Sequence, residues 1–149
     1  MQGRPDSTAS PREQEAAEAE RFGQARRARS AALAEDYVEL IADLLEVDGE
    51  ARPVDIARRL GVSHATVIKS LGRLRRENLV SGKPYRGIFL TASGEELAKR
   101  VRARHRLVVE LLVAVGVPRD DAETDAEGIE HHVSDNTLAA FARFLAARD

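Results

Sequence analysis

Residues 53–78 read PVDIARRLGVSHATVIKSLGRLRREN, and this stretch decides the fold. Its first half predicts a short helix over PVDIARRL, because Pro53 suits a first helical turn and Gly61 suits the residue just past a helix end. Its second half predicts a helix over 64–78 that Ser63 caps and that buries one apolar face. Just GVS joins the two helices. Two short helices joined by such a turn are typical of a helix-turn-helix.

The segment that follows, LVSGKPYRGIFLT, predicts a β-hairpin. Leu79–Lys83 and Arg86–Leu90 are short strand-like runs on either side of a turn that contains Gly and Pro. A helix-turn-helix followed by a basic hairpin is a winged helix. We therefore expect a mainly α fold that begins with a winged helix-turn-helix carrying a small β-hairpin wing.

Helices are predicted on both sides of this unit. Apolar residues recur at three- and four-residue spacings over 30–47, and again along a long helix that starts after Thr91 or Ser93 and runs to about Val115. Shorter helices are expected over 119–133 and 135–147. The chain then divides into a flexible arm (1–29) that becomes helical only near its end, a winged-helix domain (30–92) and a helical domain (93–149).

The charges of the chain are segregated. Residues 51–106 hold 14 Lys or Arg against 4 Asp or Glu, whereas residues 1–50 hold 6 against 12 and residues 107–149 hold 3 against 9. A basic middle between two acidic ends indicates a polyanion-binding module beside a segment that attracts cations.

The composition excludes several classes of protein. The chain has no cysteine, so disulfides, thiolate nucleophiles and iron–sulfur ligation are ruled out. It has neither a signal-peptide core nor an apolar run near the roughly 18 to 20 residues of a membrane span, so we expect a cytoplasmic protein with no membrane partner. Because HExxH, Walker, GxGxxG and GxSxG motifs are all missing, we expect no enzyme and no small organic substrate.

Double-stranded operator DNA is the expected partner of the winged helix. A recognition helix places its N-terminal residues at base edges while neighbouring cations hold phosphates. Thr66 and Lys69 are expected to approach bases, with Tyr85 against the backbone at the hairpin tip. The full set of expected DNA contacts is Ser63, His64, Thr66, Lys69, Ser70, Arg73, Lys83, Tyr85 and Arg86.

A second constellation is acidic. Two carboxylates stand three residues apart in the helix that precedes the helix-turn-helix. DAEGIEHH (125–132) places two more carboxylates and a histidine on one helical face. A further histidine lies inside the apolar stripe of the long helix, where an imidazole needs a partner. Oxygen and imidazole without thiolate suit Mn²⁺ or Fe²⁺ better than a structural zinc. These candidate ligands are Asp36, Glu39, His105, Glu127, Glu130 and His131; His132 points elsewhere and is expected to be structural or to orient a ligand.

At these residues the chain resembles the manganese transport regulators, a branch of the diphtheria-toxin-repressor-like family of metal-dependent repressors. The resemblance covers about Glu35 to Arg148. It is carried by EDYVELI, VDIARRLGVSHATVIKSLGRL, YRGIFLTASGE, RHRLVVELL and DAEGIEHHVS, in the order and spacing of the family.

The resemblance implies a repressor of manganese-uptake genes with Mn²⁺ as corepressor. It also implies that the six candidate ligands form a site for two Mn²⁺ per subunit, and that the C-terminal helices form a homodimer. Iron-responsive relatives have Met and Cys where this chain has Asp36 and Glu127, so oxygen at both positions favours Mn²⁺, with Fe²⁺ still possible.

Two other readings stay open from the residues alone. In the first, the chain is a metal-independent winged-helix regulator that responds to a small organic ligand, and its acidic residues are merely solvated. In the second, it binds or buffers metal without regulating a gene. Neither accounts for both halves of the charge pattern.

Overall fold

A computed structural model describes residues 9–82 and 87–148 of the chain. Its elements are α1 (Pro11–Asp48), α2 (Pro53–Leu60), α3 (His64–Arg76), β1 (Val80–Ser81), β2 (Phe89–Leu90), α4 (Ala92–Ala114), α5 (Arg119–Ile129), the 3₁₀ turn η1 (Glu130–His132) and α6 (Asp135–Ala146). The expected mainly helical fold with a small antiparallel hairpin is confirmed.

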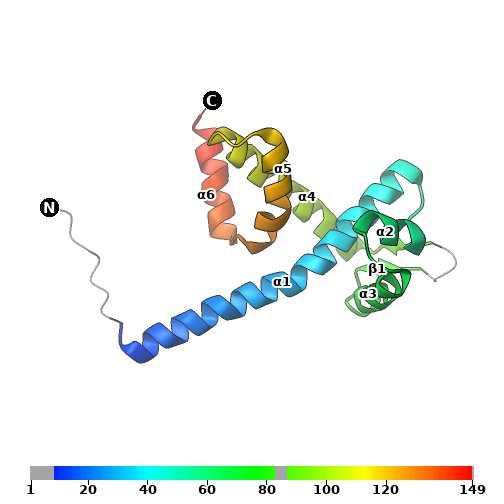
Figure 1. The fold of residues 1–149 in the computed structure, drawn as a ribbon, viewed down its shortest axis with the longest axis horizontal. Helices are drawn as coiled ribbons and strands as arrows, with labels where there is room; N and C mark the ends of the chain where they lie inside the picture. The colour runs from blue at the N-terminus through cyan, green and yellow to red at the C-terminus, as the bar shows by residue number, and fades with distance from the viewer. Residues whose placement is uncertain (1–8, 83–86, 149) are drawn as a thin grey trace.

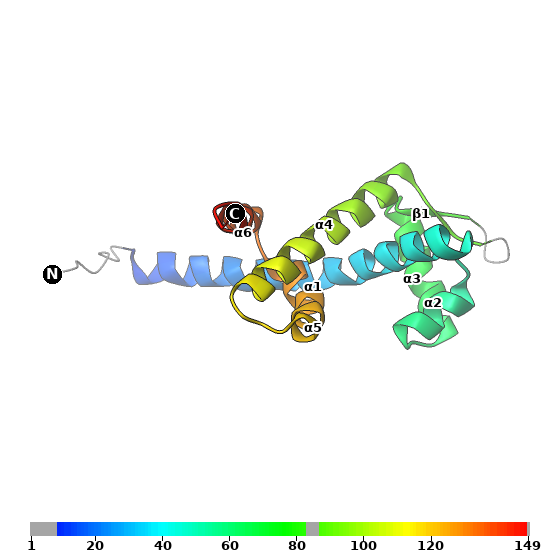
Figure 2. The same cartoon turned by 90° about the horizontal axis from the view of Figure 1, so that it is seen from above.

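Two long helices organise the molecule. α2, α3 and the hairpin gather at the C-terminal end of α1, whereas α5 and α6 lie toward the other side of the molecule (Figure 1). α4 starts beside the hairpin and runs back along α1, as the second view also shows (Figure 2). The winged-helix end and the C-terminal helices are therefore connected through α1 and α4.

The core of the winged-helix end forms where the apolar faces of three helices meet. Tyr37, Ile41 and Leu44 of α1 pack with residues of α2 and α3 and with the hairpin. Gly61 closes α2 in the left-handed conformation, at φ 69°, which glycine adopts without strain and which turns the chain into α3. The predicted helix-turn-helix is thus confirmed, with Ser63 as the N-cap of α3.

Among the described residues, the paired part of the hairpin is shorter than predicted. Val80 pairs with Leu90 and Ser81 with Phe89, in place of the longer strands expected over 79–83 and 86–90. α3 also ends at Arg76 and not at residue 78, because Asn78 takes a positive φ of 59° that leaves the helix. The hairpin tip lies outside the described residues.

A second, smaller core joins α4 to α5. Val108 and Val109 pack on Ala122 and Ala126, with Leu138 of α6 alongside. α4 begins at the Thr91 cap, whose hydroxyl accepts a hydrogen bond from the Gly94 N–H at 3.0 Å. α6 has no fully buried residue, and Phe144 keeps 45% of its surface exposed, so its apolar side is only partly covered within one chain.

The structure differs from expectation at the start of α1. The helix begins at Pro11, far ahead of the predicted start near Ser30, and its first turns extend away from the rest of the molecule (Figures 1 and 2). Ser10 and Glu13 form a reciprocal capping box, and Pro11 stands in the first turn. Apolar spacing did not reveal this part, because exposed turns need no buried stripe.

Within the described ranges, no helix combines the length and apolarity needed to cross a bilayer.

We predict that Ile56→Ala lowers the free energy of unfolding by about 2 to 5 kcal/mol, because Ile56 is fully buried and its truncation leaves a cavity. Val54 lies on the same helix with 60% of its surface exposed, and Val54→Ala should change stability by about 0.5 kcal/mol or less. Urea unfolding followed by circular dichroism measures both variants. Equal losses would contradict the packing of α2.

Candidate metal centre and nucleic-acid interface

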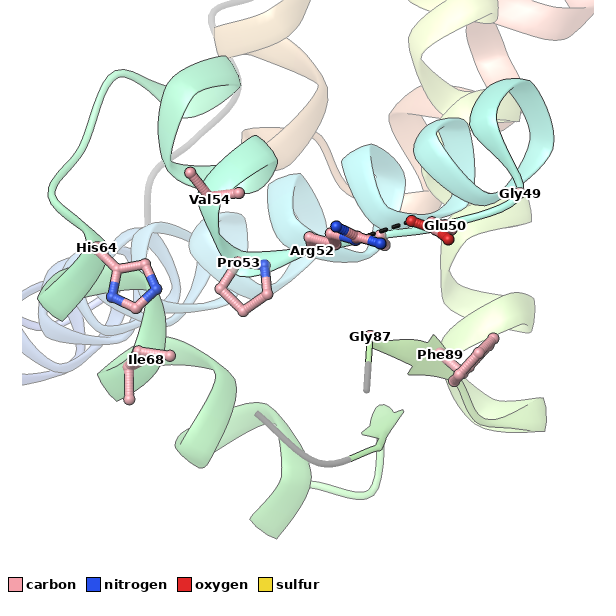
Figure 3. A pocket seen from close by; sticks show the side chains of 10 residues that line it. Gly49, Glu50, Arg52, Pro53, Val54, His64, Ile68, Gly87 and Phe89 are labelled. Atoms are coloured by element: carbon pink, nitrogen blue, oxygen red, sulfur yellow. Dashed lines mark ion pairs between the residues drawn. The ribbon is translucent and has the colours of Figure 1, made fainter. Parts of the chain in front are cut away.

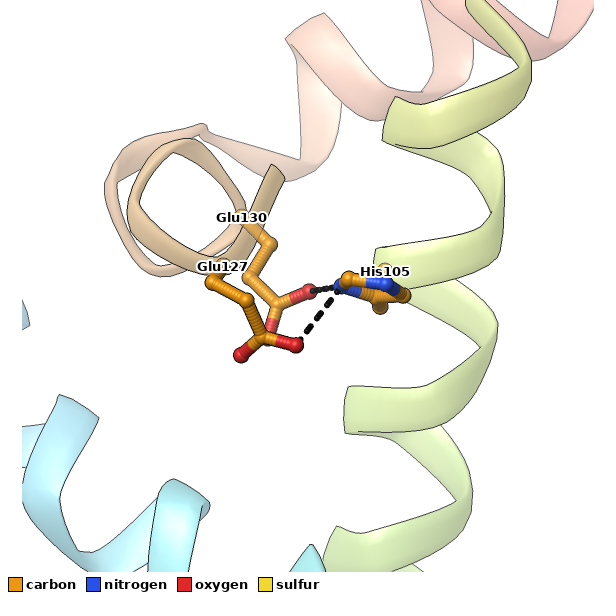
Figure 4. Close-up of side chains that lie close together, drawn as sticks. All are labelled: His105, Glu127 and Glu130. Atoms are coloured by element: carbon orange, nitrogen blue, oxygen red, sulfur yellow. Dashed lines mark hydrogen bonds and ion pairs between the residues drawn. The ribbon is translucent and has the colours of Figure 1, made fainter. Parts of the chain in front are cut away.

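Three of the predicted ligands come together between α4 and the end of α5. One ligand atom each of His105, Glu127 and Glu130 lies within 4.8 Å of the others. His105 Nδ1 is 2.8 Å from Glu130 Oε2 and 3.6 Å from Glu127 Oε1 (Figure 4). One nitrogen and two carboxylates at such distances can surround a divalent cation.

The second predicted imidazole faces α1. His131 Nε2 lies 3.1 Å from Asp36 Oδ1 and 3.5 Å from Glu130 Oε1. Glu130 therefore presents one oxygen to each histidine, and it joins the group at His105 to the group at His131. The fourth carboxylate, Glu39, is half-buried on α1 and lies near enough to Glu127 and His105 for their charges to act on it.

A short change of helix type produces this arrangement. A regular helix was predicted to continue through residue 133, but α5 ends at Ile129 and the chain tightens into a 3₁₀ turn. Successive residues of such a turn are rotated by about 120° and not about 100°. Glu130 and His131 are consecutive, and both are buried in η1, which packs against α1 and α4.

Burial without enough partners raises several pKa values here. Glu130 is fully buried, and burial raises its pKa to about 7 although both histidines oppose the shift. Burial also raises the pKa of Asp36 and of Glu39, and Glu127 adds to the effect on Glu39. For His105, burial lowers the pKa, but Glu123, Glu130 and Glu127 outweigh burial and leave the pKa raised.

Two buried atoms at the centre lack a hydrogen-bond partner. Glu130 Oε1 makes no hydrogen bond, and neither does His131 Nε2, despite its short distance to Asp36. Unsatisfied buried acceptors are costly. A carboxylate oxygen and an imidazole nitrogen are also ligands that Mn²⁺ and Fe²⁺ accept, so the residues present fit a cation of this kind.

Sequence reasoning missed an outer set of contacts. Glu35 is buried, forms an ion pair with Arg104, and places Oε2 3.3 Å from His131 Nδ1. Glu123 places Oε2 2.9 Å from His105 Nε2. The position of Glu123, four residues before Glu127, indicates the same helical face, whereas Glu35 and Arg104 carry no comparable signal. His132 is exposed.

The predicted DNA contacts of α3 form an exposed surface at its start. His64, Thr66 and Lys69 are exposed, and Ser70 is partly buried. The Ser63 hydroxyl accepts a hydrogen bond from the Thr66 N–H at 3.1 Å, and the two hydroxyl oxygens lie 2.9 Å apart, which fixes the start of the helix.

Other predicted DNA contacts are engaged or lie elsewhere. Arg73 pairs with Glu77 at 2.9 Å and donates to the Ser30 hydroxyl at 3.2 Å, so a phosphate would compete with both for this side chain. Lys83, Tyr85 and Arg86 lie outside the described residues.

A hollow of about 870 Å³ separates the start of α3 from β2 (Figure 3). His64 and Ile68 line one side and Phe89 lines the other. Arg52 and Glu50 also line the hollow and form an ion pair at 2.8 Å. None of the candidate metal ligands lines it. Phe89 is half exposed, and the hollow lies beside the start of α3.

Comparison with known proteins identifies two consecutive domains. The family described as "Iron dependent repressor, N-terminal DNA binding domain" matches residues 31–88, and "Iron dependent repressor, metal binding and dimerisation domain" matches residues 91–148. Together these matches run from the middle of α1 to α6, and of the elements in between they leave out β2, which lies between the two matched ranges.

Relatives match across most of the chain. It is 53% identical over 125 residues to the transcriptional regulator MntR of Escherichia coli O6:H1, which covers 84% of this chain and 81% of that protein. It is 39% identical over 104 residues to the HTH-type transcriptional regulator MntR of Bacillus subtilis, which covers 70% of this chain and 73% of that protein.

Solved structures share the fold. The manganese regulator SloR superposes with a TM-score of 0.67 at 32% identity, covering 76% of this chain and 53% of that one. A manganese-dependent transcriptional repressor complex with manganese superposes with a TM-score of 0.69 at 32% identity, covering 76% and 52%. This chain therefore spans about half the length of these solved proteins.

We predict that the metal-free protein becomes less stable as the pH rises from about 4.5 to 7. The unfolded Glu130 loses its proton near its ordinary pKa of 4.5, but the folded one holds it to about 7, so deprotonation favours unfolding across this window. The raised pKa of His105 acts in the same direction, because its stabilisation is lost as the pH rises through the folded value. Thermal unfolding in EDTA at several pH values measures the effect.

Glu130→Gln removes the titrating group while keeping its shape, so its unfolding temperature should depend less on pH than that of the unsubstituted protein. Glu96→Gln, at an exposed position of α4, is the matched control and should retain the original pH dependence. An unchanged pH profile in Glu130→Gln would contradict the prediction.

Proposed function

Because this chain belongs to the MntR family of transcriptional regulators, we propose that it is a Mn²⁺-dependent, DNA-binding repressor of manganese-homeostasis genes such as those for manganese uptake. One observation carries the proposal. The carboxylate and imidazole cluster takes Asp36 and Glu39 from α1, which precedes the helix-turn-helix, and its other members from α4, α5 and η1, which follow the hairpin. The metal cluster therefore spans the junction between the two halves of the chain.

The proposed ligands are Asp36, Glu39, His105, Glu127, Glu130 and His131. Two Mn²⁺ per subunit are proposed because the two oxygens of Glu130 face different imidazoles, with Oε2 toward His105 and Oε1 toward His131. Mn²⁺ is proposed ahead of Fe²⁺ because oxygen ligands predominate and because relatives are named as manganese regulators.

The bound cation supplies positive charge that offsets the repulsion among the four carboxylates. Without it, Asp36 and Glu39 on α1 repel Glu127 and Glu130, which loosens the contact of α1 with α5 and η1. The fold is kept, but the DNA-binding domain spends less time in the orientation that binds DNA. Loss of metal thus shifts the population between two orientations of this domain.

The two halves have separate proposed roles. Residues 30–92 form the DNA-binding domain, residues 93–149 the metal-binding and dimerisation domain, and residues 1–29 an arm to which no role is assigned. The half-covered side of α6, with Phe141, Phe144 and Leu145, is where the homodimer is proposed to form. A dimer fixes the spacing of two recognition helices along operator DNA.

A regulator of chromosomal genes acts where the DNA is, so the cytoplasm is the proposed location. Because its relatives are transcriptional regulators, we propose that the chain is a regulator and not an enzyme.

The proposal is tested by DNA binding to the protein's own promoter and to a manganese-transporter promoter, titrated separately with Mn²⁺, Fe²⁺ and Zn²⁺. We expect a specific complex that requires Mn²⁺. Binding that ignores metal, with no Mn²⁺ uptake in equilibrium dialysis, would favour the metal-independent regulator. Mn²⁺ uptake without any specific DNA complex would favour a metal-buffering protein.

We predict that Glu127→Ala weakens Mn²⁺-dependent operator binding at least about tenfold, because it removes a carboxylate next to His105. Fluorescence anisotropy with labelled operator and increasing Mn²⁺ measures the effect. Asp125→Ala, at an exposed position of the same helix, should behave like the unsubstituted protein. A Glu127→Ala protein with fully Mn²⁺-dependent operator binding would remove Glu127 from the ligand set.

We predict that Lys69→Ala weakens operator binding about tenfold and leaves Mn²⁺ affinity unchanged, because Lys69 is exposed on α3, away from the cluster. The same anisotropy assay at saturating Mn²⁺, together with a Mn²⁺ titration, separates the two properties. Normal operator affinity in this variant would show that α3 does not read DNA through Lys69.

A further inference from the structure

We propose that Glu123 is a positioning residue for His105: its carboxylate accepts a hydrogen bond from Nε2 of the imidazole and so leaves Nδ1 free to bind the cation. This role rests on the proposed function, because it presumes a metal at the cluster. Glu123 is the one carboxylate of α5 in contact with His105 that lies outside the proposed ligand set.

The two ring nitrogens of His105 face different carboxylates. Nδ1 lies 2.8 Å from Glu130 Oε2 and points into the cluster (Figure 4). Nε2, on the other edge of the ring, lies 2.9 Å from Glu123 Oε2. Residues 123, 127 and 130 share one face of the helical segment, so the same element supplies the contact to Nε2 and the carboxylates near Nδ1.

The contact between Glu123 and His105 determines which ring nitrogen can bind a metal. A neutral imidazole carries one proton, and only its unprotonated nitrogen can bind a metal. Both ring nitrogens of His105 face carboxylates in the metal-free protein, but a cation bound at the cluster would take the place of any proton on Nδ1. An ionised Glu123 can only accept a hydrogen bond, so it holds the remaining ring proton on Nε2. Nδ1 is then left as the ligand atom, in the orientation that the Glu123 contact fixes.

His131 has a related but not identical arrangement. Its Nε2 faces Asp36 at 3.1 Å, and its Nδ1 lies 3.3 Å from Glu35 Oε2 and 3.5 Å from Arg104 Nη2. Each imidazole thus has an outer carboxylate on the side away from the cluster. Glu35 is buried and paired with Arg104, so its removal would leave an unpaired buried charge and disturb the fold. Glu123, with 52% of its side chain exposed, allows a cleaner test.

The test compares Glu123→Gln with Glu123→Met in the full-length protein. Both remove one charge and keep the length of the side chain, but only Gln keeps an oxygen that accepts a hydrogen bond. Mn²⁺ affinity is measured from free Mn²⁺ by electron paramagnetic resonance. We expect about a tenfold loss for Met and a clearly smaller loss for Gln. Asp125→Asn is the control for charge and should stay within about twofold of the unsubstituted protein.

Nuclear magnetic resonance gives a readout that does not depend on activity. In protein loaded with diamagnetic Cd²⁺, long-range ¹H–¹⁵N spectra should show the His105 proton on Nε2 of the unsubstituted protein. In Glu123→Met the Nε2–H signal should move upfield and exchange faster, while the circular dichroism of the protein is unchanged.

The outcomes separate the two proposals. An unsubstituted protein that binds no Mn²⁺ overturns the proposed function and this role together. Normal Mn²⁺ binding by the unsubstituted protein with equal losses in Met and Gln, or no loss in Met, overturns only the role of Glu123. A ring proton found on Nδ1 also overturns it.

Discussion

The fully buried carboxylate of Glu130 is the constraint on which the rest of the junction depends. One of its oxygens meets His105, and the other faces His131 without a hydrogen bond. A buried charge with so little compensation must take up a proton or a cation. The segment that carries Glu130 packs against both α1 and α4, so whatever neutralises Glu130 also governs how these helices fit together.

Other contacts hold α1 to α4 without a bound metal ion. Arg102 of α4 pairs with Asp43 and, at 3.2 Å, with Glu46, and Arg104 pairs with Glu35. These ion pairs join α1, which carries Asp36 and Glu39, to α4, which carries His105, and they hold the two helices together when no metal is bound. In the proposed mechanism a bound cation would tighten a contact that already exists. We therefore propose a shift between orientations of the DNA-binding domain, and not unfolding, when the metal is lost.

Much of the fold was predictable because burial leaves a periodic trace. The apolar faces of α2 and α3, the Ser63 cap and the hairpin all follow from local pattern. Five of the six candidate ligands stood out by their helical spacing and His105 by its place in an apolar stripe, but the distances among them depend on tertiary packing. The early start of α1, the 3₁₀ turn at Glu130 and the outer carboxylates Glu35 and Glu123 were not predicted. Exposed helix leaves no apolar stripe, and an ion pair between distant residues leaves no mark in either local sequence.

The continuity of α1 gives one polypeptide segment two unrelated duties. Between residues 35 and 46 its apolar side packs into the core of the winged helix. Its acidic side faces the carboxylate and imidazole cluster and the arginines of α4. Residues 11–22 are exposed throughout. Tolerance to random substitution should therefore change abruptly along a single uninterrupted helix. Its first turns can drift in sequence almost freely, whereas the later turns can vary only where a change satisfies both halves of the molecule at once.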